Sequence, residues 1–146
     1  MPATLSHQVS GPPSADAPAV VLLGSLGSDR SMWDAQVRDL ARDHVVIAVD
    51  HRGHGNSDVI PGPCTIADLS GDVLALLDTL GEGHVHVVGL SLGGAVAQWL
   101  AVHEPTRVRS AALLCTAARF GEPSGWADRA AAVREGGTAA VADAVV

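Results

Sequence analysis

Short apolar runs alternate along the chain with longer stretches in which apolar residues recur every three or four positions. Such runs are typical of buried strands, and they lie at residues 19–23, 45–49, 84–88 and 108–115. The longer stretches have the spacing of amphipathic helices, and they lie at residues 32–42, 66–80 and 94–103. Strands and helices that alternate in this way predict a mostly parallel sheet with helices on both faces.

Three residues indicate where the first two helices begin and end. Ser31 precedes the first helix and Thr65 precedes the second, and each has the hydroxyl that a helix N-terminus prefers. Gly81 stands where the second helix should stop. The apolar face of this second helix consists of Ile66, Leu69, Val73, Leu76, Leu77 and Leu80.

The two ends of the chain follow different patterns. Residues 4–9 predict a short strand, and a Pro/Ser-rich turn follows it. After residue 115 the chain changes to two Ala-rich helical segments, 126–134 and 138–146, which Gly136 and Gly137 divide. No internal repeat and no linker to a second folded domain is visible, so the length suits one domain.

The composition is that of a compact globular protein. Of the 146 residues 47% are hydrophobic and 17% are charged, and the formal net charge is −7. This acidic balance argues against a nucleic acid or an anionic membrane as the partner. No stretch approaches the roughly 18 apolar residues that span a bilayer, and the first residues do not resemble a signal peptide. We therefore expect a cytoplasmic protein.

The two cysteines, Cys64 and Cys115, are too few for a disulfide scaffold and do not have the spacing of a metal site. We expect two reduced thiols and no bound metal.

The most informative motif is Gly-Leu-Ser-Leu-Gly at residues 89–93, a G-x-S-x-G sequence between a predicted strand and a predicted helix. A sharp strand-to-helix turn of this kind presents the Ser91 hydroxyl for nucleophilic attack. Gly89 and Gly93 remove side chains that would collide across the turn. The helix after Ser91 directs free N–H groups toward the serine, so the N–H of Leu92 is a candidate donor to an oxyanion.

Two further loops follow strands at the same edge of the predicted sheet. Residues 24–29 read Gly-Ser-Leu-Gly-Ser-Asp, and residues 50–57 read Asp-His-Arg-Gly-His-Gly-Asn-Ser. Together with the turn at Ser91, these loops resemble, in order and spacing, the oxyanion loop, the D-x-R-G-x-G-x-S loop and the nucleophile elbow of the α/β-hydrolase family. The resemblance implies the α/β-hydrolase fold, incomplete at its C-terminal side. Residues 1–117 would form the N-terminal part of the core, and residues 118–146 the start of a helical lid.

Residues 24–34 and the segment 126–130 are also similar to one branch of this family, the 3-oxoadipate enol-lactonases of aromatic catabolism. The resemblance implies that Ser91 attacks the carbonyl of a small enol-lactone, and that water then hydrolyses the acyl-enzyme. The backbone N–H groups of Leu26 and Leu92 would form the oxyanion hole. Ser25 and Trp126 are candidate substrate-binding residues, although Trp126 is equally consistent with packing in the lid. The resemblance implies neither a metal nor an organic cofactor.

The serine needs a base and an orienting carboxylate, and the family places both after later strands. No histidine follows His103, so the triad is incomplete in this chain. His51 and His54 are the only upstream candidates for the base, and the alternative is that they shape their loop. Arg52 could bind a substrate carboxylate, or it could pair with Asp50 or with loop carbonyls. We expect Trp33 and Trp99 to be core residues.

Two functional hypotheses follow. The first is a serine hydrolase represented by its amino-terminal half, either a lactonase or a general carboxylesterase. The second is a noncatalytic α/β-hydrolase-like binding module that has lost its acid and base. In both, the strand at residues 108–115 would expose an apolar edge, which predicts a complementing carboxyl-terminal half or a homo-oligomer as partner.

Overall fold

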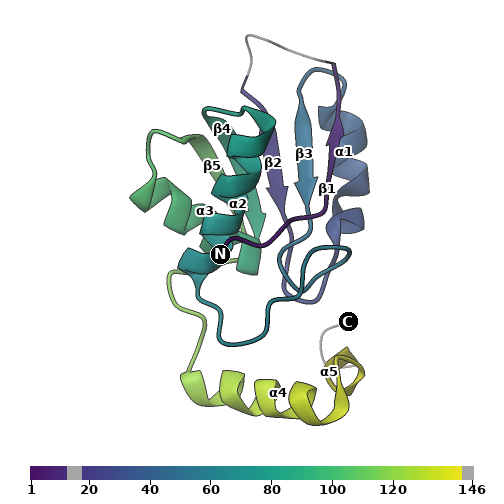
Figure 1. The fold of residues 1–146 in the computed structure, drawn as a ribbon, viewed down its shortest axis with the longest axis vertical. Helices are drawn as coiled ribbons and strands as arrows, with labels where there is room; N and C mark the ends of the chain where they lie inside the picture. The colour runs from purple at the N-terminus through teal and green to yellow at the C-terminus, as the bar shows by residue number, and fades with distance from the viewer. Residues whose placement is uncertain (13–17, 143–146) are drawn as a thin grey trace.

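The computed structural model describes residues 1–12 and 18–142, and it contains one five-stranded sheet (Figure 1). The strand order is β1-β3-β2-β4-β5. The strands are β1 (His7–Ser10), β2 (Val20–Leu23), β3 (Val46–Val49), β4 (Val85–Leu90) and β5 (Val108–Leu114). Strands β2 to β5 pair in parallel, and β1 pairs antiparallel with β3. The predicted mostly parallel sheet is therefore confirmed.

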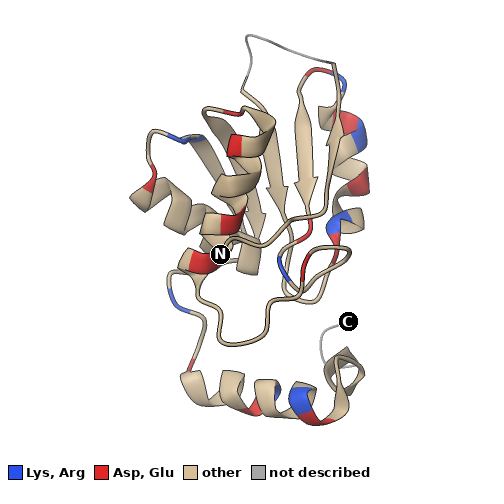
Figure 2. Ribbon diagram, viewed as in Figure 1, with Lys and Arg blue, Asp and Glu red and all other residues tan. Residues whose placement is uncertain are grey.

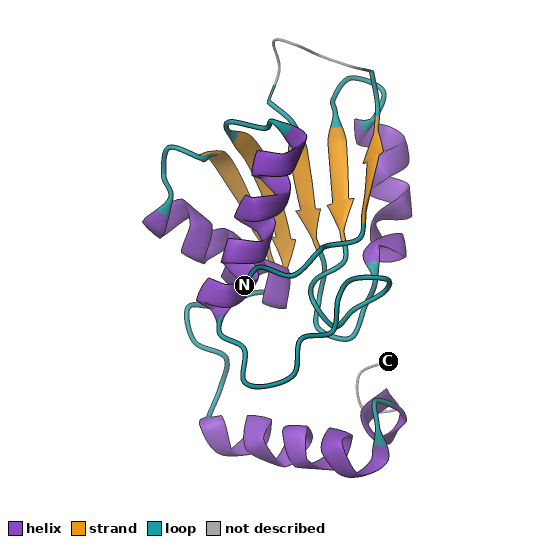
Figure 3. Ribbon diagram, in the orientation of Figure 1, coloured by secondary structure: helices purple, strands orange, loops and turns teal. Residues whose placement is uncertain are grey.

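Helices cover both faces of this sheet, as the apolar runs predicted (Figure 3). The helices are α1 (Asp34–Leu40), α2 (Ile66–Leu80), α3 (Leu92–His103), α4 (Pro123–Gly136) and α5 (Ala139–Ala142), with a 3₁₀ helix at Arg30–Trp33. Alternate residues of the central strands point to opposite faces. In β2, Val21 and Leu23 pack with α2 and α3, while Val20 and Leu22 pack with Trp33 and α1. Strands β2, β3 and β4 carry no Lys, Arg, Asp or Glu (Figure 2).

The second helix begins and ends where the sequence predicted. The Thr65 side chain accepts from the N–H of Asp68, whose carboxylate accepts in turn from the N–H of Thr65, and this is a capping box. Gly81 closes the helix in the left-handed region, at φ 76°.

The first helix begins differently. Ser31 was predicted to cap it, but Ser31 lies inside a 3₁₀ helix capped by Asp29, whose carboxylate accepts from the N–H of Ser31 at 2.9 Å. The first turn is then a 3₁₀ helix, and α1 starts only at Asp34.

The first strand is also shorter than the predicted range 4–9. Thr4 exchanges backbone and side-chain hydrogen bonds with Asp58 at 2.9 and 3.1 Å, so this residue is joined to a loop and not to a strand. The Pro/Ser-rich turn predicted after it lies largely outside the described residues.

Strand β5 is at the edge of the sheet, and α4 and α5 lie beyond the carboxyl ends of the parallel strands (Figure 1). The segment 108–115 was predicted as a buried strand, but at the sheet edge β5 is largely exposed, and Leu113 and Leu114 are 46% and 39% exposed. Helix α4 starts at Pro123, three residues before the predicted segment, and has no buried residue. None of the described helices is long and apolar enough to cross a membrane.

Candidate active site

Ser91 sits at the turn where β4 ends and α3 begins, with φ 52° and ψ −108°. A non-glycine residue in this region costs on the order of 1–3 kcal/mol, and such strain concentrates at functional sites. The turn is held in place from the next strand, because the Ser91 N–H donates to the Leu114 carbonyl at 2.9 Å. The Thr116 hydroxyl donates to the Ser91 carbonyl, also at 2.9 Å. The strained turn that the motif predicted is therefore present.

The glycines around Ser91 are required by close backbone contacts. A Cβ on Gly89 would collide with the backbone of Gly93, and a Cβ on Gly93 would collide with the carbonyl of Leu23 in β2. A Cβ on Gly94 would collide with the Thr116 side chain, a contact that the motif alone does not predict. The chain can therefore make this turn, and seat α3 against β2, only with glycine at these places.

The loop at residues 24–29 lies beside this turn. The Gly93 N–H donates to the Gly24 carbonyl at 3.0 Å, so the start of α3 is joined to the start of the loop. Leu26 and Leu92, the two residues predicted to supply oxyanion donors, line the same pocket as Ser91. The Ser25 carbonyl accepts from the hydroxyl of Ser28 at 2.8 Å, and Ser25 is not among the residues that line the pocket.

The pocket has a volume of about 430 Å³, and apolar groups dominate its wall. It is lined by Leu26, Ile66, Ser91, Leu92, Arg119, Phe120, Gly121, Pro123 and Trp126. Trp126 was predicted either to line the pocket or to pack in a lid, and its side chain lines the pocket while remaining 41% exposed. Its Nε1–H donates to the Phe120 carbonyl at 2.5 Å, and the two rings meet edge to face with centroids 6.3 Å apart.

Arg119 is the charged residue of this pocket, and sequence reasoning missed it. No motif surrounds it; its only signal is that it follows the carboxyl end of a predicted parallel strand, where ligands bind. Its Nη2 donates to the Glu122 carboxylate at 3.2 and 3.3 Å, and both side chains are exposed. An exposed ion pair of this kind is worth only about 0–1 kcal/mol. The guanidinium is therefore free to exchange Glu122 for a ligand.

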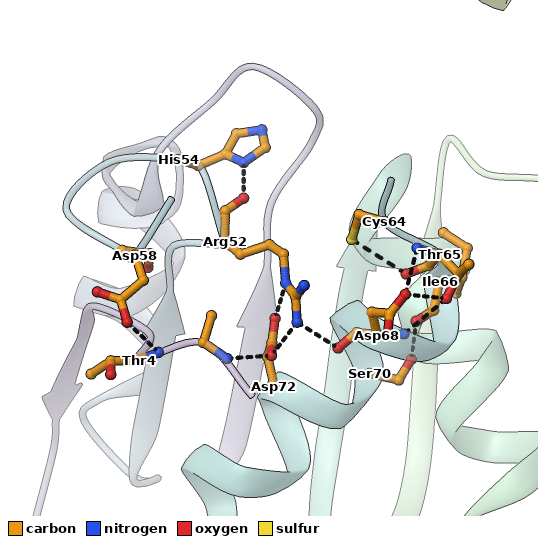
Figure 4. A network of polar contacts seen from close by, with 12 residues as sticks. Thr4, Arg52, His54, Asp58, Cys64, Thr65, Ile66, Asp68, Ser70 and Asp72 are labelled. Atoms are coloured by element: carbon orange, nitrogen blue, oxygen red, sulfur yellow. Dashed lines mark hydrogen bonds and ion pairs between the residues drawn. The ribbon is translucent and has the colours of Figure 1, made fainter. Parts of the chain in front are cut away.

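Arg52, by contrast, is fully engaged (Figure 4). Asp50 was the charged partner predicted for it, but its Nε and Nη2 donate to the two carboxylate oxygens of Asp72 at 2.5 and 2.6 Å. Asp50 is instead paired with Arg30, whose backbone N–H and Nη1 donate to it at 2.6 and 2.5 Å. Both carboxylates are buried. These two pairs hold the 50–57 loop against α2 and the 3₁₀ helix, so Arg52 is not the group that meets a substrate.

Neither loop histidine is placed as a base for Ser91. His51 is buried, and neither of its ring nitrogens has a hydrogen-bond partner among the described residues. Burial lowers the pKa of His51 to about 4, and the charge of the nearby His54 ring adds to this effect. His54 uses both ring nitrogens, with Gly27 and Arg52 as partners. Neither histidine lines the pocket with Ser91.

The tryptophans and cysteines outside the pocket have no catalytic partner among the residues described above. Trp33 is buried as predicted, and Trp99 is partly buried and stacks on His103 with ring centroids 4.3 Å apart. Cys64 and Cys115 are free and exposed. Within residues 1–12 and 18–142, His, Cys, Asp and Glu do not gather in a group of three that could hold a metal ion.

Comparisons with known proteins agree with this geometry. Residues 18–140 match the family model described as alpha/beta hydrolase fold. 3-Oxoadipate enol-lactonase 1 of Acinetobacter baylyi is 42% identical over 136 residues, which cover 93% of this chain and 50% of that protein. The crystal structure of the enol-lactonase from Burkholderia xenovorans LB400 is 44% identical with a TM-score of 0.93, and the match covers 97% of this chain and 54% of that one.

A thermophilic esterase from Thermogutta terrifontis is 33% identical with a TM-score of 0.88, over 97% of this chain and 52% of that one. The chain thus spans about half the length of the relatives it matches. The matched region includes the 24–29 loop, the 50–57 loop and the strained turn at Ser91. With its parallel sheet, its glycine-lined elbow and this match, the chain belongs to the α/β-hydrolase fold family.

Proposed function

We propose that this chain is the nucleophile-bearing part of a serine hydrolase, with Ser91 as the nucleophile. The observation that carries the proposal is the strained backbone of Ser91 at the start of α3, in a pocket at the carboxyl ends of the strands. A protein that only binds a partner gains nothing from a strained serine turn. The strained turn at Ser91 therefore favours an enzyme over the noncatalytic binding module.

In the proposed reaction the Ser91 Oγ attacks the carbonyl carbon of the substrate, and a base removes the hydroxyl proton. The N–H groups of Leu26 and Leu92 donate to the oxyanion, a contribution worth about 3–4 kcal/mol per donor in comparable sites. The intermediate expels its alkoxide or enolate oxygen, which leaves an acyl-Ser91. Water, activated by the same base, then releases the carboxylic acid.

The substrate class that we propose is a small enol-lactone with a carboxylate, as in 3-oxoadipate enol-lactone. Three features support it: the pocket is small and apolar, its charged residue is Arg119, and two of the relatives named above are enol-lactonases. A general carboxylesterase is the second candidate, because apolar groups dominate the pocket wall and the Thermogutta terrifontis relative is an esterase.

The acid and base of the triad come, in this proposal, from residues outside this chain. All of its histidines are described, and none of them is among the residues that line the pocket with Ser91. A complementing carboxyl-terminal half would bring both groups to the pocket.

The test uses a complemented enzyme, defined as this chain co-expressed with the part of the Burkholderia xenovorans enol-lactonase that follows the matched region. It should hydrolyse 3-oxoadipate enol-lactone faster than a neutral aryl ester of similar size. Ser91→Ala should abolish both activities, a loss of at least about 3 kcal/mol of transition-state stabilisation, with an unchanged circular dichroism spectrum. Equal or faster turnover of the neutral ester would favour the carboxylesterase. An active Ser91→Ala enzyme would refute the hydrolase proposal.

A further inference from the structure

The 24–29 loop is held at two points that lie on opposite sides of Leu26. At its base, the Gly24 carbonyl accepts from Gly93, as described above. Near its tip, the Gly27 N–H donates to Nε2 of His54 at 2.9 Å. This is the hydrogen bond that ties the tip of the loop, residues 26–27, to another segment of the described chain. Leu26 N–H, the proposed oxyanion donor, lies one residue before it.

The partners of His54 determine which ring nitrogen carries the hydrogen. Its Nδ1 is 3.0 Å from the Arg52 carbonyl oxygen, which can only accept, so Nδ1 must be the donor. The Gly27 N–H can only donate, so Nε2 must be bare. Both bonds therefore exist together only in the neutral ring with its hydrogen on Nδ1.

The support behind His54 is rigid. Its acceptor belongs to Arg52, whose guanidinium is clamped on buried Asp72, and Asp72 also accepts from the Ala3 N–H at 2.7 Å (Figure 4). A continuous set of hydrogen bonds thus runs from helix α2 through Arg52 and His54 to the tip of the 24–29 loop.

We propose that neutral His54 is a positioning residue, which holds the 24–29 loop through Gly27 so that the Leu26 N–H points at the oxyanion. This proposal rests on the proposed function, because it gives His54 a role in the same reaction. His54 does not touch the substrate. It acts by fixing the donor in advance, which is what makes an oxyanion hole effective.

A second ring hydrogen is incompatible with this arrangement, because it would place an Nε2–H donor against the Gly27 N–H donor. The aromatic neighbour of His54 is the His51 ring, whose centroid lies 6.2 Å from that of His54.

The hydrogen bond can be tested in the complemented enzyme without measuring its activity. In ¹⁵N-labelled protein at neutral pH, we expect a through-bond coupling between the Gly27 nitrogen and Nε2 of His54. The coupling should be lost in His54→Phe. Absence of the coupling at neutral pH, or a hydrogen on Nε2, would overturn the proposal.

The catalytic consequence is tested in the complemented enzyme. His54→Phe should lower kcat about tenfold or more with little change in KM, because the loss lies in the transition state. His54→Gln should recover part of the loss, since its amide oxygen can accept from Gly27.

The matched control is His103→Phe. His103 also bonds a carbonyl through Nδ1, that of Trp99 at 2.9 Å, but at the far end of α3. Its kcat should be that of wild type. If His54→Phe has the kcat of wild type while Ser91→Ala is inactive, the proposed role of His54 is refuted and the proposed function is not affected. An active Ser91→Ala enzyme would refute the proposed function. The hydrogen bond from Gly27 to His54 would then be tested by its through-bond coupling alone.

Discussion

At the scale of single residues, Arg119 and Arg42 offer a matched test of substrate charge. Both guanidinium groups are 71% exposed and both form an i,i+3 ion pair, but Arg119 lines the pocket and Arg42 pairs with Asp39 on the surface. In the complemented enzyme, Arg119→Gln should raise KM for a carboxylate-bearing lactone about tenfold, equivalent to about 1.4 kcal/mol. KM for a neutral ester should not change, and Arg42→Gln should change neither. Equal effects on the charged and neutral substrates would exclude Arg119 as the carboxylate ligand.

His51 predicts how stability depends on pH. Its folded-state pKa of about 4 lies below the ordinary 6.5, so the unfolded chain binds the proton more readily between these values. The contribution of neutral His51 to the free energy of unfolding is therefore fully present above about pH 6.5. It decreases as the pH falls toward 4, by roughly 3 kcal/mol at most. Urea unfolding of the chain at pH 7 and pH 4.5 should show a smaller drop in His51→Gln than in wild type. An identical drop would mean that His51 is not buried neutral.

At the scale of elements, the substitutions Gly93→Ala and Gly71→Ala should change the stability of the chain in opposite directions. A Cβ at Gly93 meets the backbone of Leu23, which cannot move aside without breaking the pairing of β2 with β4. Gly93→Ala should therefore lower the free energy of unfolding by about 1–3 kcal/mol. Gly71 lies within α2 with open space around its Cβ position, so alanine should stabilise that helix by about 0.5–1 kcal/mol. Denaturant unfolding measures both, and a neutral Gly93→Ala would show that the elbow has room to relax.

At the scale of the whole molecule, β5 decides how the isolated chain behaves. Within residues 1–12 and 18–142 its outer edge is unpaired, and Leu113 and Leu114 are exposed, which favours pairing with another chain. Without a complementing half, the chain should dimerise or aggregate as its concentration rises, and it should not hydrolyse ester or lactone. Leu113→Lys should shift sedimentation toward the monomer. Val59→Lys, at a loop residue that is 78% exposed, should not. A monodisperse wild-type monomer that turns over substrate would contradict this prediction.

The sequence by itself determined the order of the elements and the place of the nucleophile. Short apolar runs specify parallel strands because both faces must be covered, and the structure has strands at the four predicted places, β2, β3, β4 and β5, although β5 is largely exposed. The elbow was predictable because local sterics alone demand glycine on either side of Ser91. The Thr65 cap and the Gly81 stop are equally local, and both are present.

Only the tertiary structure decided the ion pairs, the pocket wall and the state of the histidines. Asp50 is two residues from Arg52 in the sequence, yet Arg52 pairs with Asp72 in α2, because the loop turns its guanidinium toward that helix. Arg119 lies near Ser91 only because the chain crosses beyond the sheet edge after β5. The bond from Gly27 to His54 joins residues 27 positions apart. Long-range contacts of this kind depend on how the elements pack against one another, and the hydrophobic periodicity of the sequence does not predict them.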